Sequence, residues 1–168
     1  MAVANPLSSR KYPGMVTIID DLDYDLVTRN KWRAHRQRDG LFYAIRTRTS
    51  ADPPGTPLTV YLHRVIANTP NGSLTDHRDR DGLNNQRSNL RTATKRQNGC
   101  NCPNRVHNTS GYRGVRQRGN GWVAQITAFR RNHYLGYFHT PEEAARAYDR
   151  KAREFHGEFA TTNFGEAV

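Results

Sequence analysis

Residues 76–98, DHRDRDGLNNQRSNLRTATKRQN, decide the expected fold of the first half of the chain. The stretch begins with an Asp-His pair, passes through a loop rich in Gly and Asn, and continues into a short strand-like run at residues 90–93. Thr94 and Gln97 match a capping box, so the pattern predicts a short helix that contains Asn98. The expected order is strand, loop, strand and helix, a unit too small to enclose a hydrophobic core alone.

The polar residues of this stretch suit phosphodiester hydrolysis. Asp76 offers a carboxylate and Asn98 an amide oxygen, and both are hard oxygen ligands of the kind that Mg²⁺ accepts. His77 is an imidazole that can take a proton from water near neutral pH. Neighbouring residues of a regular strand point to opposite faces, so Asp76 and His77 can share a site only where the strand ends or bulges. The loop that begins at Arg78 supplies that irregularity.

By the spacing of these residues, the stretch resembles the HNH endonucleases, also called ββα-metal nucleases. The upstream run LHRVIA at residues 62–67 is similar to the phage and intron-encoded branch of that family. The resemblance implies that His77 is the general base, that Asp76 and Asn98 are metal ligands, and that Asn89 holds the loop and orients His77. Asn98 stands where many relatives have His, which favours Mg²⁺ or Mn²⁺ over Zn²⁺ as the divalent metal cofactor.

A simpler interpretation exists for each of these residues taken alone. An Asp-His pair in a polar loop is usually solvated, and Asn and Gly between strands are common turn residues. His63, in the LHR run, is expected to contact a phosphate, to brace the nuclease fold or to be a packed, hydrogen-bonded histidine.

Composition indicates a polyanionic partner. The chain has 168 residues and a net charge of +11, with 26 Lys and Arg against 15 Asp and Glu. Nucleic acid and an anionic membrane surface both fit this charge. No apolar run reaches the length of a membrane span, and residues 1–14 lack the apolar core of a signal peptide. We therefore expect a soluble protein of the cytoplasm, or of the host cytoplasm if it is phage-encoded.

The first half of the chain otherwise reads as rich in β structure. Residues 1–14 are expected to form either an ordered lead-in or a loose arm. The expected elements that follow are a strand at 15–19, a short helix at 25–32, a hairpin of 32–37 with 41–47, and a strand passing into a helix at 58–67.

The second half begins after a segment, residues 99–109, whose Asn, Gly and Pro content is typical of a linker. Three strands are expected there, at residues 112–118, 122–128 and 134–138. A helix should follow, with Thr140 as N-cap, Pro141 in the first position, Glu143 closing a capping box and Gly157 beyond the end. Small alanines would bring this helix close to one face of the sheet.

The other face of the sheet is expected to be open and basic, suited to a DNA major groove. The runs YRGVRQR, LGYF and EEAARAYDRKA resemble the plant Apetala/ethylene-response-factor DNA-binding domain. The resemblance implies DNA-binding positions at Arg113, Arg116, Arg118, Gln125, Thr127, Asn132 and Tyr134. The last four differ in kind from the family's residues, so the binding surface carries over but the target sequence does not. A solvated charged face is the alternative.

Together these observations predict an α+β protein with two domains. A nuclease domain is expected at residues 1–98, with its ββα-metal core at about 58–98, and a DNA-binding domain at residues 110–165. The predicted function is a metal-dependent endonuclease that hydrolyses one strand of double-stranded DNA per active site. The resemblance to mobile phage nucleases implies, by analogy alone, a homing or genome-competition role. A non-catalytic transcription regulator or a DNA-packaging factor is the alternative, and the sequence leaves open whether the chain is a monomer or a homodimer.

Overall fold

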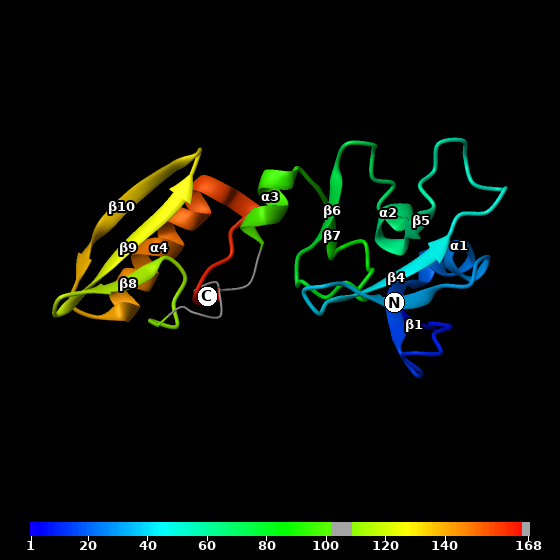
Figure 1. Ribbon diagram of the computed structural model, residues 1–168, viewed down its shortest axis with the longest axis horizontal. Helices are drawn as coiled ribbons and strands as arrows, with labels where there is room; N and C mark the ends of the chain where they lie inside the picture. The colour runs from blue at the N-terminus through cyan, green and yellow to red at the C-terminus, as the bar shows by residue number, and fades with distance from the viewer. Residues whose placement is uncertain (102–108, 166–168) are drawn as a thin grey trace. The chain divides into compact units, whose positions relative to one another are not determined.

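The computed structural model describes residues 1–101 and 109–165. The chain folds as two compact units, Met1–Asn98 and Gly99–Val168 (Figure 1). Both units combine small antiparallel sheets with short helices, which confirms the predicted α+β class. Of the linker expected at residues 99–109, residues 102–108 lie outside the described part of the chain.

The first unit is built from two-stranded and three-stranded sheets joined by short helices. In chain order its elements are β1 (Ala2–Pro6), β2 (Val16–Asp20), a 3-10 turn (Asp21–Asp23), α1 (Tyr24–Thr28), β3 (Arg33–Arg36), β4 (Phe42–Thr47), β5 (Thr59–Tyr61), α2 (Leu62–Ile66), β6 (Leu74–His77), β7 (Leu90–Ala93) and α3 (Lys95–Cys100), whose last residues belong to the second unit. The predicted hairpin is present as β3 and β4, and β5 extends it to a sheet of order β3-β4-β5.

Of the two possibilities for the N-terminus, the structure shows an ordered lead-in at β1 and not a loose arm. This strand pairs antiparallel with β2, from Ala2 opposite Asp20 to Pro6 opposite Val16. Asn5 is buried and Val3 packs against the core, so the strand has an inward face although its sequence is short and partly polar. Pro6 is tolerated because it lies at the end of the strand.

The core of the first unit gathers residues from almost every element around Trp32. The Trp32 side chain is buried, and its indole N–H donates to the Val27 carbonyl at 2.9 Å, which anchors the end of α1. Ile19, Leu62 and Ile66 complete the fully buried centre. Such burial stabilises a small unit by roughly 2 kcal/mol for each large aliphatic side chain.

The strands β6 and β7 form an antiparallel pair that leads directly into α3. The capping box predicted at the start of α3 is present. The Thr94 N–H donates to the Gln97 side-chain oxygen at 2.8 Å, and the Gln97 N–H donates to the Thr94 hydroxyl oxygen at 3.3 Å. Strand, strand and helix therefore occur in the order that residues 76–98 predict.

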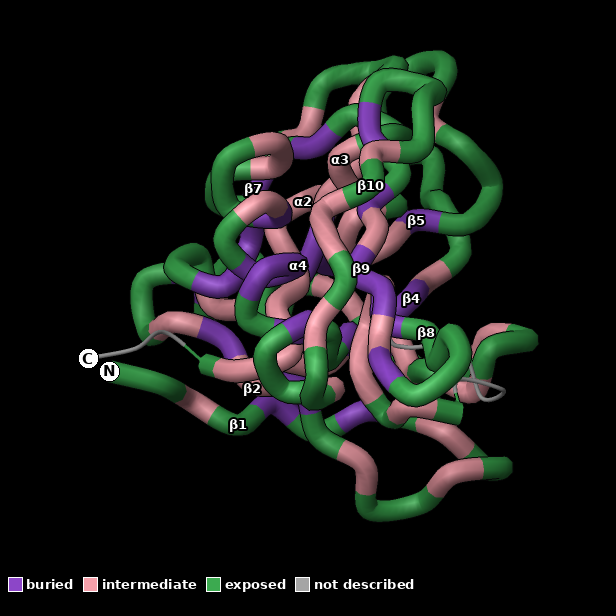
Figure 2. The backbone as a smooth tube through the Cα atoms, turned by 90° about the vertical axis from the view of Figure 1, so that its left-hand side faces the viewer, coloured by how far each residue is buried: buried purple, intermediate pink, exposed green. Residues whose placement is uncertain are grey.

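The second unit is a three-stranded antiparallel sheet covered on one face by a helix. Its main elements are β8 (Val115–Arg118), β9 (Gly121–Ala128), β10 (Arg131–Phe138), α4 (Pro141–His156) and a 3-10 turn (Gly157–Phe159). The sheet order is β10-β9-β8, and both α4 and β9 carry buried stretches (Figure 2).

The predicted boundaries of α4 are confirmed. Thr140 is the N-cap, the reciprocal bonds with Glu143 are both formed, and Pro141 opens the helix. Gly157 ends it with a φ of 53°, a conformation that costs glycine little. Ala144, Ala145 and other small residues of α4 pack on the sheet, as their helical spacing predicts.

Candidate functional site

Asp76 and His77 are the last two residues of β6, where the sequence requires a strand end. Both are buried, with 6% and 5% of their surface exposed. Asp76 lies directly opposite Arg91 on β7. The Arg91 Nε and Nη2 atoms lie 2.8 and 2.7 Å from the Asp76 Oδ2 atom, so a buried ion pair sets the direction of the carboxylate. Arg91 is a site residue that the sequence interpretation missed.

The ring of His77 is held by a chain of hydrogen bonds whose direction can be deduced. His77 Nε2 lies 3.2 Å from Asn85 Oδ1, and Asn85 is completely buried. The Asn85 amide group donates to the Thr17 hydroxyl at 2.7 Å and also to the Gly82 carbonyl at 3.4 Å. Thr17 donates in turn to the Leu83 carbonyl at 2.8 Å.

The Leu83 carbonyl at the end of this series can only accept a hydrogen bond, so the direction of every bond before it is fixed. His77 Nε2 must therefore carry the proton that is donated to Asn85 Oδ1. The lone pair of the neutral ring is then on Nδ1. Asn85 and Thr17 therefore select one tautomer of His77. The sequence interpretation assigned the orientation of His77 to Asn89, but the direct bond comes from Asn85.

The surroundings of His77 keep its ring neutral at physiological pH. Burial lowers the pKa of His77, and the bond to Asn85 and the charges of Asp79 and Asp76 oppose this only in part. A neutral imidazole with its lone pair on a defined nitrogen is the form that a general base requires.

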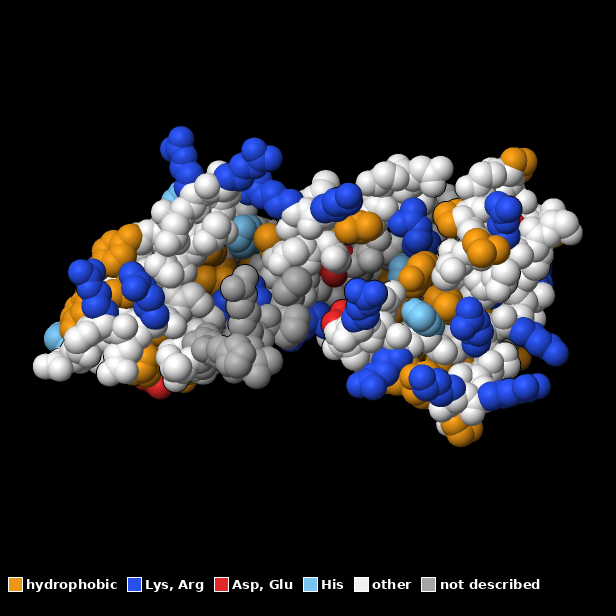
Figure 3. Space-filling view, in the orientation of Figure 1, with side chains coloured by type: hydrophobic (Ala, Val, Ile, Leu, Met, Phe, Trp, Pro, Cys, Tyr) orange, Lys and Arg blue, Asp and Glu red, His pale blue; other side chains and the backbone are white. Residues whose placement is uncertain are grey.

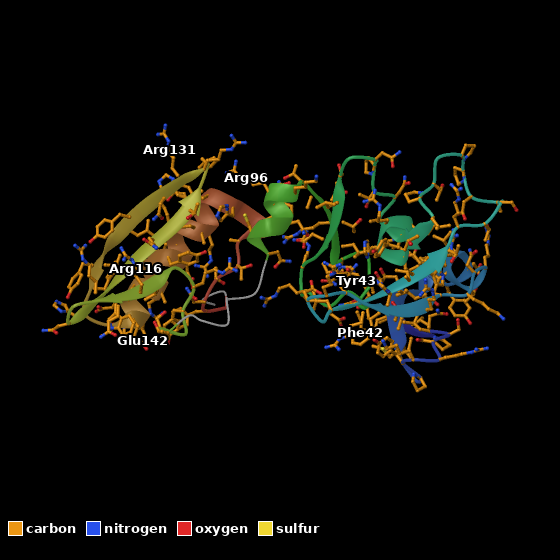
Figure 4. The ribbon with its side chains drawn as sticks, in the orientation of Figure 1. Phe42, Tyr43, Arg96, Arg116, Arg131 and Glu142 are labelled. Carbon is orange, nitrogen blue, oxygen red and sulfur yellow. The ribbon has the colours of Figure 1, made fainter. Side chains whose placement is uncertain are left out.

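The ring of Tyr43 and a second histidine, His63, pack around His77. Its ring centroid lies 5.9 Å from that of Tyr43 and 5.0 Å from that of His63, which is perpendicular to it. Tyr43 projects from β4 on the side opposite to Phe42, toward the strands that carry the site (Figure 4). His63 is 8% exposed, and its Nδ1 atom has no hydrogen-bond partner among the residues that the structure describes. Burial lowers the pKa of His63 to about 3, so this residue packs as a neutral ring against the site.

Asn89 fixes the loop that follows His77. Its Oδ1 atom accepts from the Asp79 N–H at 3.1 Å, and its Nδ2 atom donates to the Asp79 carboxylate at 2.9 Å and to the Asn84 carbonyl at 2.8 Å. The Arg78 N–H donates to the Asn89 carbonyl at 2.9 Å. Asn89 thus acts on the loop backbone, while Asn85 contacts the ring.

Asn98 lies in the first turns of α3 and is half-buried, with its N–H donating to the Thr94 carbonyl at 3.0 Å. Across residues 1–101 and 109–165, no group of three or more His, Cys, Asp and Glu side chains could hold a metal ion. The expected ligand pair, the Asp76 carboxylate and the Asn98 carboxamide, has fewer members than such a group and includes an amide. Two hard oxygen ligands fit Mg²⁺, which keeps several water molecules of its own.

The open face of the second unit carries six of the seven expected DNA-binding residues. Arg116, Arg118, Thr127, Asn132 and Tyr134 are exposed and Gln125 is partly exposed. Gln125 lies opposite Tyr134 in the sheet, and the Asn132 amide donates to the Gln125 side-chain oxygen at 3.2 Å. The strand register places these side chains on the same face of β8, β9 and β10, with Arg116 projecting from β8 (Figure 4).

Arg113 does not lie on that face, contrary to the expectation. It precedes β8, and its guanidinium bonds to the Tyr148 side chain on α4 and to the Cys100 carbonyl, the latter at 3.5 Å. The cause is Gly114, whose φ of 72° turns the chain and whose missing side chain lets the backbone press against the Tyr148 ring. A β-carbon at this position would lie 2.1 Å from that ring.

Comparisons with known proteins give two kinds of relative. The chain is 36% identical over 109 residues to an uncharacterized HNH endonuclease of Acanthamoeba polyphaga mimivirus, covering 61% of this chain and 56% of that protein. It is 52% identical over 59 residues to an ethylene-responsive transcription factor of Arabidopsis thaliana, covering 33% of this chain and 23% of that protein. It is 41% identical over 73 residues to an AP2/ERF and B3 domain-containing transcription repressor of the same plant, covering 43% of this chain and 20% of that protein. No family model matches the chain.

The chain thus has partial similarity to a protein named as an HNH endonuclease and to a plant transcription factor and a plant transcription repressor. It spans about half the length of the viral relative and less than a quarter of the two plant relatives. In the described residues, no helix is long and apolar enough to cross a membrane.

Proposed function

We propose that the protein is a metal-dependent endonuclease of the HNH kind that hydrolyses one strand of double-stranded DNA per active site. The observation that carries the proposal is the hydrogen-bond series from His77 through Asn85 to Thr17. A solvated Asp-His pair, the simpler interpretation, would need neither burial nor a fixed tautomer. The partial similarity to a viral protein named as an HNH endonuclease supports the same conclusion.

In the proposed mechanism, His77 takes a proton from water on its Nδ1 atom while Asn85 holds the proton on Nε2. The positive charge that develops on the ring is stabilised by the nearby carboxylates of Asp79 and Asp76. Asn89 holds the loop after β6 so that the ring keeps its position. Asp76 and Asn98 would hold Mg²⁺ or Mn²⁺, which when bound supplies charge stabilisation to the phosphate and the departing 3′ oxygen.

The second unit is proposed to position the protein on duplex DNA. Arg116 and Arg118 would neutralise phosphates or contact guanine, and Gln125 would contact a base edge, from a sheet lying in the major groove. The names of the plant relatives support a DNA-binding role for this kind of domain. One active site in each chain would cut one strand, so a double-strand break would need two chains or two encounters.

The biological role is proposed by analogy to mobile nucleases: homing or competition between genomes, in the cytoplasm of the cell that carries the DNA. The alternative function is a DNA-binding transcription regulator with a vestigial nuclease motif. The names of the plant relatives favour it. Only the regulator would bind DNA without cutting it.

Supercoiled plasmid incubated with the full chain and Mg²⁺ distinguishes the two functions. If the protein is a nuclease, the wild type should convert plasmid to the nicked form and His77→Ala should not. The wild type and His77→Ala should bind the same labelled duplex equally well in EDTA. The matched control is His139→Ala, which removes an exposed histidine and should nick like the wild type. Equal plasmid survival with wild type and His77→Ala, together with intact binding, would leave the regulator as the better account.

A further inference from the structure

The first unit contains a basic hollow of about 450 Å³ that the proposed mechanism does not use. The basic residues that line it are Arg10, Lys11, Arg33, His35 and Arg36. No Asp or Glu is among its lining residues. In Figure 3, Lys and Arg side chains gather over the lower part of this unit, where Figure 1 shows the N-terminal strands.

The hollow exists because the loop between β1 and β2 folds back against β3. The Ser8 N–H donates to the Trp32 carbonyl at 2.7 Å, and the Ser8 hydroxyl donates to the same oxygen at 3.1 Å. Further along the loop, the Tyr12 ring meets the Phe42 ring edge-on at 4.9 Å. These contacts tie the loop to the sheet at both ends. The walls of the hollow are therefore ordered before any ligand arrives.

The charge of the hollow is not balanced within the protein. Arg46, Arg87 and Arg91 of the same unit are each paired with a carboxylate. The four Lys and Arg residues of the hollow are exposed, and none of them forms an ion pair within the described part of the chain. Like charges gathered in a concave surface repel one another and concentrate a positive potential there. Such an arrangement is stabilised by an anion that contacts several of these side chains at once.

The hollow is close to the candidate active site through the pairing of β3 with β4. His35 lies directly opposite Tyr43, so the two side chains share one face of the sheet. The Tyr43 ring in turn lies 5.9 Å from that of His77. One cross-strand neighbour and one ring contact therefore separate the lining residue His35 from His77, so the hollow and the candidate site lie on the same part of the first unit.

We propose that the basic hollow binds a phosphate of the DNA backbone near the cleaved bond. This inference rests on the proposed function, because it places the hollow relative to the bond that His77 would act on. It adds a sequence-independent DNA contact in the first unit, separate from the sheet of the second unit. Arg33 and Arg36 approach the phosphate from β3, and Arg10 and Lys11 approach it from the loop.

The test compares two double variants that lose the same charge. Arg33→Gln/Arg36→Gln removes two cations of the hollow, and Arg29→Gln/Lys31→Gln removes two exposed cations outside it. Binding of the full chain to a labelled DNA duplex is measured by fluorescence anisotropy in EDTA over a range of salt concentrations. The hollow variant should bind on the order of tenfold more weakly at 0.1 M salt, with a salt slope shallower by about two. The control variant should keep the wild-type slope.

Several outcomes would overturn the inference. Equal weakening by the two double variants would mean that only net charge matters, and an unchanged slope in the hollow variant would mean that no phosphate is bound there. A loss confined to a matched RNA duplex would assign the hollow to RNA instead. If Arg33→Gln/Arg36→Gln fails to fold by circular dichroism, Arg10→Gln/Lys11→Gln on the loop gives the same readout.

Position is tested by replacing single phosphates with neutral methylphosphonates around the mapped nick. The expected result is that a neutral phosphate at one position flanking the nick weakens binding of the wild type but not of the hollow variant. The same weakening in both proteins contradicts the proposal. The failures are distinguishable. If the wild type does not nick DNA but the hollow variant still shows a shallower salt dependence of DNA binding, the proposed function fails and the phosphate contact at the hollow stands. If His77→Ala abolishes nicking while the hollow variant binds normally, only the hollow inference fails.

Discussion

Arg91 on β7 contacts the Oδ2 atom of Asp76 on β6 through two nitrogens, at 2.8 and 2.7 Å, and both side chains are 7% exposed. Removing the guanidinium would leave the buried Asp76 carboxylate without the positive charge of Arg91. Arg91→Met should therefore lower the free energy of unfolding by about 3–5 kcal/mol, measured by urea denaturation. Arg91→Lys should lose less, because it keeps the charge but not the two-nitrogen geometry.

The control for this prediction is Arg29→Met, an exposed position where a change within about 0.5 kcal/mol is expected. If Asp76 binds the cation, millimolar Mg²⁺ should raise the melting temperature of Arg91→Met more than that of the wild type, because the cation replaces the lost positive charge. A variant as stable as the wild type would contradict the role given to this ion pair.

The bond from Asn85 to His77 should control catalysis separately from DNA binding. Asn85→Ala removes the acceptor that holds the proton on Nε2, and the nicking rate should fall about 10- to 100-fold, the scale seen when a partner that orients a functional histidine is lost. Affinity for duplex DNA should not change. Single-turnover nicking and anisotropy measure the two quantities, below the melting temperature of the variant.

Thr17 offers a graded control for Asn85. Thr17→Ser keeps the hydroxyl that receives the Asn85 amide and should nick at close to the wild-type rate, whereas Thr17→Val loses it and should nick more slowly. A folded Asn85→Ala protein that nicks at the wild-type rate would mean that tautomer selection has no part in the reaction.

His63 should make the first unit sensitive to acid. Its pKa is lowered from 6.5 to about 3 in the folded state, chiefly by burial. As pH falls below 6.5, the unfolded chain binds a proton that the folded chain does not, so stability is lost by up to about 1.4 kcal/mol per pH unit until the folded pKa is reached. Above pH 6.5, His63 is neutral in the folded and unfolded states, and stability no longer depends on its protonation.

Urea denaturation at pH 7, 6 and 5 tests this dependence. His63→Gln should flatten the decline in stability with acid, while His139→Gln, at an exposed position, should leave it unchanged. A residual slope is expected from His77, whose pKa is lowered in the same direction. The same acid sensitivity in His63→Gln as in the wild type would show that His63 takes up its proton without cost.

The sheet of the second unit should contribute to DNA affinity independently of the metal. Arg116→Ala should weaken binding and reduce the salt slope by about one, while Mg²⁺ binding, followed by calorimetry, persists. Arg150→Ala, an exposed arginine on α4, is the matched control and should bind DNA like the wild type. Loss of Mg²⁺ binding in Arg116→Ala would contradict the division of roles between the two units.

Local patterns of the sequence predicted local structure well. The capping boxes at Thr94 and Thr140, the hairpin of β3 and β4 and the α+β class are all confirmed, because each depends on residues close together in the chain. The expected position of the Asp-His pair at a strand end is confirmed for the same reason.

Contacts between distant segments were not predictable in this way. The bond from Asn85 to Thr17 joins residues 68 apart, and neither residue stands out in the sequence. The pairing of β1 with β2 follows from a short, partly polar strand that local propensity does not single out. Arg113 was misplaced because the bend at Gly114 depends on packing against Tyr148, which only the folded unit reveals.

The most direct measurement of the central claim is the single-turnover nicking rate of supercoiled DNA with saturating protein and Mg²⁺, for wild type and His77→Ala at equal DNA occupancy. The account predicts a rate at least about 100-fold lower for His77→Ala, with circular dichroism and DNA affinity unchanged. Equal rates in the two proteins would contradict it.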